Sequence, residues 1–221
     1  MPFLGIVFDF DGTIVDTERV IYDCWREVFR KYGHDLPLEA WVQYVGAATG
    51  AIDPYQMLEV KLGRPVDRVE VDVYRRPLEK EMLAKEPMRP GVSELIEDAR
   101  RKGLRLAVAS NSQEPWVTRG LEALGIAHHF EAVCTPDDGV DPKPSPALYL
   151  LAVERLGIPP GRALAIEDSP LGAQSAVAAG LACVVVPSAL TKHESFPPQC
   201  VVLDTLEGLD IDQLVDLGQR S

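Results

Sequence analysis

Five short segments of this 221-residue chain are almost entirely apolar, and they constrain the fold more than any other feature. None alternates with polar residues, which is typical of strands that are covered on both faces of a parallel sheet. Segments with helical spacing lie between them. This alternation predicts an α/β fold with a doubly wound parallel sheet. The predicted strands are residues 3–9, 104–110, 130–134, 163–168 and 181–186, with a short sixth near residue 200.

A helical stretch interrupts the alternation directly after the first predicted strand. Residues 16–85 are rich in charged residues and helix formers, and glycines divide the stretch into several helices. Because the stretch leaves and rejoins the core at neighbouring points, it predicts a small helical cap domain inserted into a core of residues 1–15 and 86–221. The first helix of this domain has an apolar face at helical spacing, formed by Tyr22, Trp25, Val28 and Phe29.

Polar residues follow the predicted strands at the points where the strands end. Ligands bind beyond the carboxyl ends of the strands in such a sheet, so these residues should converge on one edge. Helices are expected to begin there too, because Pro115, Pro146 and Pro170 suit a first helical turn and Ser145 and Ser169 suit N-caps. Helix N-termini favour anions. The converging residues are Asp9, Asp11, Ser110, Asn111, Ser112, Lys143, Glu167, Asp168 and Ser169.

This combination of side chains indicates phosphoryl transfer with a magnesium ion. Crowded carboxylates bind hard cations, and Mg²⁺ typically takes one or two carboxylates together with substrate phosphate. A carboxylate can also attack as a nucleophile and form an aspartyl phosphate. Mg²⁺, Lys143 and backbone N–H groups could neutralise the phosphoryl charge. One of Asp9 and Asp11 would then attack, and the other would carry the proton.

The order of these motifs resembles that of the haloacid dehalogenase superfamily of aspartate-nucleophile phosphatases. The motifs are DFDGT from Asp9, then Ser110-Asn111, Lys143-Pro144 and Glu167-Asp168. The helical insert is similar to the small cap of the β-phosphoglucomutase and phosphoglycolate phosphatase-like subfamily. The resemblance covers essentially the whole chain, and it implies a Rossmann-like core.

The resemblance also implies a role for each matching residue. Asp9 would be the nucleophile and a metal ligand, and Asp11 would be the general acid and base and would lend its backbone carbonyl to Mg²⁺. Ser110 and the N–H of Asn111 would hold the phosphoryl oxygens, and Lys143 would neutralise nucleophile and phosphate. Asp168 would bind Mg²⁺, with Glu167 supporting it directly or through water.

Residues of the cap, and Trp116 after the second motif, are weaker candidates. Those that could face the substrate are Glu18, the loop around residues 46–50, Arg75, Arg76 and Lys80, and a surface role is equally compatible with each. Trp116 could touch the site, but we interpret it as a packing residue. Cap closure over the substrate, on linkers near residues 13–17 and 84–90, is expected to exclude water.

Other functions remain open. A β-phosphoglucomutase-type mutase would carry a cap histidine and an arginine where Ile21 and Thr49 stand, so these departures favour hydrolysis. Dehalogenases resemble this pattern without Asp11, and a phosphonate hydrolase needs a cap lysine that is not found near Gly46. A non-catalytic binding protein with this fold would be expected to have lost one of the chemical positions.

Composition limits the partners. The 34 acidic and 22 basic residues give a net charge of −12, which disfavours sequence-independent binding to nucleic acid or anionic membranes. No apolar run reaches the roughly 18 residues of a membrane span. Four scattered cysteines and no recognisable signal peptide favour the cytoplasm. We therefore expect a monomer or weak dimer that acts on a small phosphorylated metabolite such as a sugar phosphate.

Overall fold

Six parallel strands form one sheet in the part of the chain that the structure describes. The structure is a computed structural model, and it describes residues 3–45 and 53–218. The strand order is β3-β2-β1-β4-β5-β6, so β1 lies between β2 and β4 in the interior of the sheet. The strands are β1 (Gly5–Phe8), β2 (Arg105–Ala109), β3 (Ala132–Cys134), β4 (Ala163–Glu167), β5 (Ala182–Val185) and β6 (Val201–Val202).

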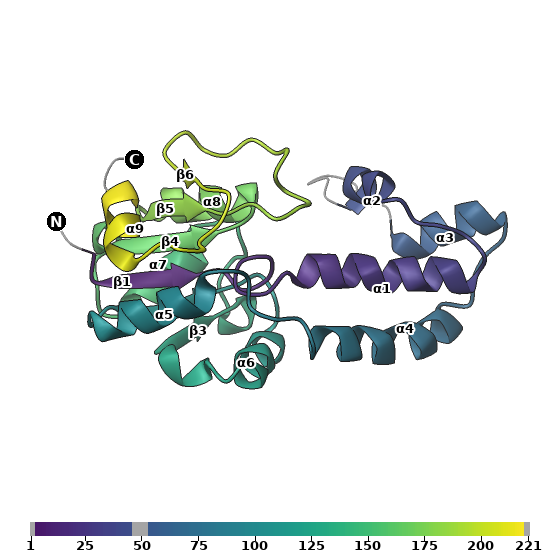
Figure 1. Cartoon of the computed structure of the whole chain (residues 1–221), viewed down its shortest axis with the longest axis horizontal. Helices are drawn as coiled ribbons and strands as arrows, with labels where there is room; N and C mark the ends of the chain where they lie inside the picture. The colour runs from purple at the N-terminus through teal and green to yellow at the C-terminus, as the bar shows by residue number, and fades with distance from the viewer. Residues whose placement is uncertain (1–2, 46–52, 219–221) are drawn as a thin grey trace. The chain divides into compact units, whose positions relative to one another are not determined.

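Helices cover both faces of this sheet (Figure 1). Successive strand residues point to opposite faces, and each face has its own apolar layer. Ile6 and Phe8 pack with α5, α6 and α9 on one side, whereas Val7 packs with α7 and α8 on the other. These helices are α5 (Val92–Arg101), α6 (Glu114–Ala123), α7 (Ala147–Arg155), α8 (Pro170–Ala178) and α9 (Ile211–Gly218), and three short 3₁₀ helices are η1 (Ala127–His129), η2 (Pro136–Asp138) and η3 (Pro160–Arg162).

The chain divides into two units. The core unit consists of Met1–Asp16 and Pro87–Ser221, and the helical unit is Thr17–Glu86. The apolar face predicted for the first cap helix is buried within the helical unit. Aromatic contacts join its helices, since the rings of Trp25 and Tyr55 meet edge to face at 4.8 Å. The helices are α1 (Thr17–Lys31), α2 (Leu38–Val45), α3 (Pro54–Leu62) and α4 (Arg68–Leu83), and α1 and α4 run side by side (Figure 1).

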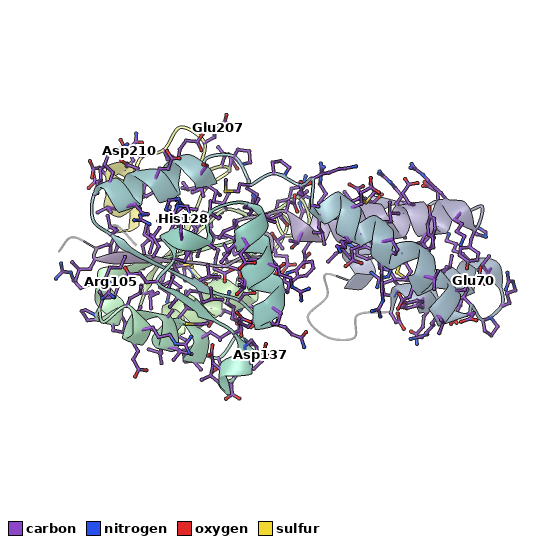
Figure 2. All side chains as sticks on the ribbon, turned by 90° about the horizontal axis from the view of Figure 1, so that it is seen from below. Glu70, Arg105, His128, Asp137, Glu207 and Asp210 are labelled. Carbon is purple, nitrogen blue, oxygen red and sulfur yellow. The ribbon has the colours of Figure 1, made fainter. Side chains whose placement is uncertain are left out.

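Charged side chains on the outside of the core unit tie its periphery together. Figure 2 labels Arg105, whose guanidinium binds the carboxylate of Glu131 at 2.6 Å and so joins the first residue of β2 to the segment before β3. It also labels Asp137 on η2, whose carboxylate accepts a hydrogen bond of 2.8 Å from the N–H of Glu114 at the start of α6. The second contact fixes the end of α6 that lies nearest to the motif Ser110-Asn111.

The predicted fold class is confirmed. Each predicted strand is present and is shorter than its apolar run, and the short sixth strand is β6. Ser169 caps α8 as predicted, because its hydroxyl accepts a hydrogen bond from the N–H of Gly172 at 3.1 Å. The prediction for Ser145 was wrong: the N-cap of α7 is Pro146, and α7 begins one residue later than expected. None of the described helices is long and apolar enough to cross a bilayer.

Candidate active site

The residues predicted to converge do so at the carboxyl edge of the central strands. Asp9 directly follows β1, and its N–H donates to the carbonyl of Ile166 on β4 at 2.9 Å. Ser110 directly follows β2, and Glu167 is the last residue of β4. Because β2, β1 and β4 are neighbours in the sheet, residues far apart in the sequence become adjacent here.

Lys143 joins two of these strand ends. It reaches the site from the loop before α7, and its ammonium group lies 2.6 Å from Asp9 Oδ1 and 2.6 Å from Glu167 Oε1. All three side chains are buried. Removing one member of a buried ion pair leaves an uncompensated charge, which destabilises by about 3–5 kcal/mol. This triad therefore fixes the positions of two carboxylates that would otherwise repel each other.

The second oxygen of Asp9 is in a different situation. Asp9 Oδ2 is buried and has no hydrogen-bond partner among the described residues. A buried carboxylate oxygen without a partner is unfavourable unless a ligand or a metal ion completes its surroundings. Asp9, Glu167 and Asp168 each offer a carboxylate oxygen, and these oxygens lie within 4.8 Å of one another. A buried set of oxygen ligands of this size suits a hard divalent cation such as Mg²⁺.

The turn after β1 is shaped to admit Asp168. Gly12 has a φ of +85°, and a Cβ at this position would lie 2.2 Å from Asp168 Oδ2. Only glycine adopts this conformation readily and leaves room for the carboxylate. Gly12 in the first motif thus permits the turn after β1 and also leaves room for Asp168 of the fourth motif.

Both carboxylate oxygens of Glu167 accept hydrogen bonds from several protein donors. Its Oε1 accepts from Lys143 and from the hydroxyl of Tyr149 at 2.7 Å. Its Oε2 accepts from the N–H of Asp168 and from both the N–H and the hydroxyl of Ser169. A carboxylate has about four lone-pair positions, so these contacts occupy both oxygens.

Asp11 is surrounded by hydroxyl and indole donors. The hydroxyl of Ser112 donates to Asp11 Oδ2 at 2.6 Å, and that of Ser110 lies 3.4 Å from the same oxygen. The indole N–H of Trp116 donates to Asp11 Oδ1 at 2.9 Å. The interpretation of Trp116 as a packing residue was therefore incomplete, because its ring packs against the core while its N–H binds the site.

Asn111 connects the second motif to the third through its side chain. Its amide oxygen accepts from the N–H of Lys143 at 2.7 Å, and its amide group donates to the carbonyl of Lys143 at 3.2 Å. This two-point contact fixes the backbone that carries the buried lysine. Sequence reasoning assigned only the backbone N–H of Asn111 to the site.

For both Asp9 and Lys143, burial and the neighbouring charges of opposite sign shift the pKa in opposite directions. Burial raises the pKa of Asp9, and the adjacent ammonium group of Lys143 opposes that effect. Burial alone would lower the pKa of Lys143, but the carboxylates of Asp9 and Glu167 outweigh it and raise the pKa. Burial and the carboxylate of Glu167 raise the pKa of Tyr149, which keeps its hydroxyl a donor.

The candidates in the cap that the structure describes belong to the helical unit. Glu18 lies in the first turn of α1, within the helical unit. Arg75 is engaged inside that unit by Asp72 and Glu79, and Arg76 binds Asp72 at 2.9 Å. Thr49 and the loop around residues 46–50 lie outside the described residues.

Sequence reasoning missed Tyr149, placed Ser112 at the strand end without a role, and named Trp116 only as a residue that could touch the site. A signal existed for Tyr149, because a tyrosine at a fully buried helical position usually finds a partner for its hydroxyl. No local pattern identified the partner of Trp116, because Asp11 is 105 residues away in the sequence.

Comparison with known proteins agrees with this geometry. Residues 3–180 match the haloacid dehalogenase-like hydrolase family. Over 212 residues the chain is 36% identical to YhcW, a proposed phosphatase of Bacillus subtilis (strain 168), covering 96% of each chain. It is 31% identical to the fructose-1-phosphate phosphatase YqaB of Escherichia coli (strain K12), covering 83% of this chain and 96% of YqaB.

A solved structure extends the similarity to the whole fold. A variant of CbbY from Rhodobacter sphaeroides in complex with xylulose-(1,5)bisphosphate superposes with a TM-score of 0.72 at 28% identity. The match covers 96% of this chain and 99% of that one. The sequence match and the shared fold together show that this chain is an enzyme of the haloacid dehalogenase-like hydrolase family.

Proposed function

We propose that the protein is a Mg²⁺-dependent phosphatase that hydrolyses a small phosphomonoester, of the sugar phosphate class, through an aspartyl-phosphate intermediate. The observation that carries this proposal is the asymmetry of Asp9. One of its oxygens is neutralised by Lys143 at 2.6 Å, and the other is buried with no hydrogen-bond partner among the described residues. Asp9 also lies beside the carboxylates of Glu167 and Asp168. A nucleophilic carboxylate needs such an arrangement, because one oxygen must be held while the other remains available.

The residues of the site suit each step of the reaction. Asp9 attacks phosphorus, and the bond between phosphorus and the leaving oxygen breaks as Asp11 donates a proton to that oxygen. Water then attacks the phosphoryl group on Asp9 and gives its proton to Asp11, and inorganic phosphate leaves. Lys143 keeps Asp9 oriented and balances negative charge throughout.

The same carboxylates would hold the metal ion. Asp9 and Asp168 are the proposed ligands, together with the backbone carbonyl of Asp11, and Glu167 supports them through its contacts with Lys143 and the N–H of Asp168. When bound, Mg²⁺ supplies positive charge that stabilises the transferring phosphoryl group.

The names of two relatives favour a sugar phosphate as the substrate. YqaB is a fructose-1-phosphate phosphatase, and the CbbY variant holds xylulose-(1,5)bisphosphate. We propose that this chain acts on the same chemical class, and that the helical unit, with Glu18 in its first turn, contributes to the choice among sugar phosphates.

Phosphate release from a panel of phosphorylated metabolites tests the proposal. The panel contains fructose 1-phosphate, glucose 6-phosphate, glucose 1-phosphate, xylulose 1,5-bisphosphate and glycolate 2-phosphate, each with Mg²⁺ and with EDTA. We expect release that requires Mg²⁺ and falls by at least about 10³-fold in Asp9→Asn. The matched control is Asp141→Asn, an exposed aspartate two residues before Lys143, which should retain wild-type activity.

Two outcomes would contradict the proposal. Activity of Asp9→Asn equal to that of the wild type would exclude Asp9 as the nucleophile. Interconversion of glucose 1-phosphate and glucose 6-phosphate without net phosphate release would identify a mutase instead, despite Ile21 and Thr49.

A further inference from the structure

The carboxylate of Asp11 is held at both oxygens by a single segment of the core unit. Trp116 lies in the first turn of α6 and donates its indole N–H to Oδ1 at 2.9 Å. Ser112, in the loop that leads into α6, donates its hydroxyl to Oδ2 at 2.6 Å. Two donors on different oxygens restrict both the rotation and the tilt of a carboxylate, whereas one donor leaves it free to turn.

The position of Trp116 depends on a close contact one helical turn further on. Trp116 and Gly120 lie four residues apart and therefore on the same face of α6. Gly120 faces the ring of Phe10, and a Cβ at this position would lie 2.3 Å from its Cζ atom. Phe10 is the residue between Asp9 and Asp11, so α6 lies directly against the motif that it serves.

Two further contacts keep α6 in this place. Val117 and Leu121 are buried in the apolar layer below the helix. At the N-terminal end, the carboxylate of Asp137 accepts from the N–H of Glu114 at 2.8 Å. The helix thus presents Trp116 to Asp11 from a fixed base, as a preorganised supporting group requires.

We propose that Trp116 is a positioning residue for proton transfer, and that together with Ser112 it fixes Asp11 in the orientation from which it protonates the leaving oxygen. The inference rests on the proposed function, because it assigns Asp11 the role of general acid. Trp116 does not touch the substrate in this account. It acts by setting the orientation of the Asp11 carboxylate, and the contact between Gly120 and Phe10 sets the distance of Trp116 from Asp11.

A comparison of substrates with different leaving groups distinguishes this positioning role of Trp116 from a purely structural one. The leaving group of an alkyl phosphate departs as an unstable alkoxide unless Asp11 supplies a proton. The leaving group of p-nitrophenyl phosphate departs as a stable phenolate and needs no proton. The quotient kcat/KM reports the steps up to formation of the phosphoenzyme, in which this first proton transfer occurs. A misplaced Asp11 should therefore slow the alkyl phosphate and spare the aryl phosphate.

The experiment compares Trp116→Phe with the wild type on two substrates, p-nitrophenyl phosphate and the alkyl phosphate of the panel that the wild type hydrolyses fastest. Phenylalanine keeps an aromatic ring and removes the N–H donor. We expect kcat/KM to fall about tenfold for the alkyl phosphate and less than about twofold for p-nitrophenyl phosphate. Asp11→Asn should show the same selectivity with a larger loss, of about 10² or more.

Two other variants complete the design. Thr118→Val is the matched control, because it removes a hydroxyl from α6 that contacts only Glu114 among the described residues and lies away from Asp11, and it should behave as the wild type does. Gly120→Ala keeps every donor but forces α6 away from Phe10. It should reproduce the selectivity of Trp116→Phe for alkyl over aryl phosphates.

Each outcome is decisive. Equal losses on both substrates, in a Trp116→Phe protein with the unfolding midpoint of the wild type, would make Trp116 a structural residue and overturn the inference. Unchanged kcat/KM on both substrates would overturn it as well. In either case an active wild type leaves the proposed function intact, whereas a wild type that releases no phosphate from any substrate would overturn the proposed function and this inference together.

Discussion

At the scale of single residues, Glu167 and Asp168 are neighbours with different surroundings. Both oxygens of Glu167 accept hydrogen bonds from protein donors, whereas Asp168 turns its carboxylate toward Gly12. Glu167→Gln should therefore lower the free energy of unfolding in EDTA by about 3 kcal/mol, because Lys143 loses a charged partner. Asp168→Asn should weaken Mg²⁺ binding by about 100-fold or more, because it removes a proposed ligand of the ion.

Chemical denaturation in EDTA and titration calorimetry with Mg²⁺ measure the two quantities on the same proteins. Unchanged stability of Glu167→Gln, or an Mg²⁺ affinity of Asp168→Asn equal to that of the wild type, would contradict the roles assigned to these two residues. Asp141→Asn again provides the reference for an exposed carboxylate of the core unit.

Tyr149 is a second residue whose contribution can be isolated. Its hydroxyl donates to Glu167 at 2.7 Å in a fully buried position, and the ammonium group of Lys143 lies 5.0 Å from the centre of its ring. Tyr149→Phe keeps the ring and removes the donor, so the free energy of unfolding should fall by about 1.5–3 kcal/mol. Tyr74→Phe, in an exposed ring of α4, should change it by less than about 0.5 kcal/mol.

At the scale of elements, nearly continuous apolar segments made the strands predictable. A buried strand has few polar positions to confuse its pattern, so all six strands were assigned to the correct segments and only their ends differed. Helix α9 was not predicted, although Ile211, Leu214 and Val215 have helical spacing, because eight residues are too few for this spacing to identify a helix. What fixes α9 is a tertiary contact with α5, which a local pattern does not contain.

The site divides in the same way. Asp9, Lys143 and Asp168 could be predicted because each follows a strand or begins a helical connection at the same edge of the sheet. The contact of Trp116 with Asp11 could not, since it depends on how closely α6 approaches Phe10. That approach is set by the packing of one glycine and leaves no periodic signal in the sequence.

The contact between α5 and α9 predicts a dependence of stability on pH. Asp98 on α5 accepts from the N–H of Ile211 at the start of α9 at 3.0 Å and binds Lys102 at 3.1 Å. The Ile211 N–H, Lys102 and Arg101 lower the pKa of Asp98 from 3.8 to about 2. Its contribution to stability is therefore fully present above the ordinary pKa and is lost as the pH falls through the lowered value.

Asp98→Asn tests that contribution directly. At neutral pH the variant should unfold at a denaturant concentration clearly below that of the wild type, and the difference should shrink as the pH falls from about 4 to about 2. Glu97→Gln, which changes the exposed neighbouring carboxylate, should show no such convergence. A difference that stays constant over this pH range would mean that the carboxylate is not the group that joins α9 to α5.

At the scale of the whole molecule, the two units have separate apolar interiors. Both layers of the sheet lie in the core unit, whereas Trp25, Phe29, Leu58 and Val71 are buried within the helical unit. Every proposed metal ligand also belongs to the core unit. Binding of Mg²⁺ should therefore stabilise one unit against local unfolding more than the other.

Hydrogen exchange with and without Mg²⁺ measures this difference residue by residue. At a concentration of 100 times the dissociation constant, binding stabilises the unit that holds the ion by about 2.7 kcal/mol, which slows its slowest amides by about 100-fold. We expect this slowing for the amides of β1 and β4 and less than about twofold for those of α1 and α4. The same measurement on Asp168→Asn should show no such slowing in either unit at that concentration. Equal slowing in both units would contradict the expectation, because it would mean that the helical unit and the sheet open only together and that the insert is not an independent unit of stability.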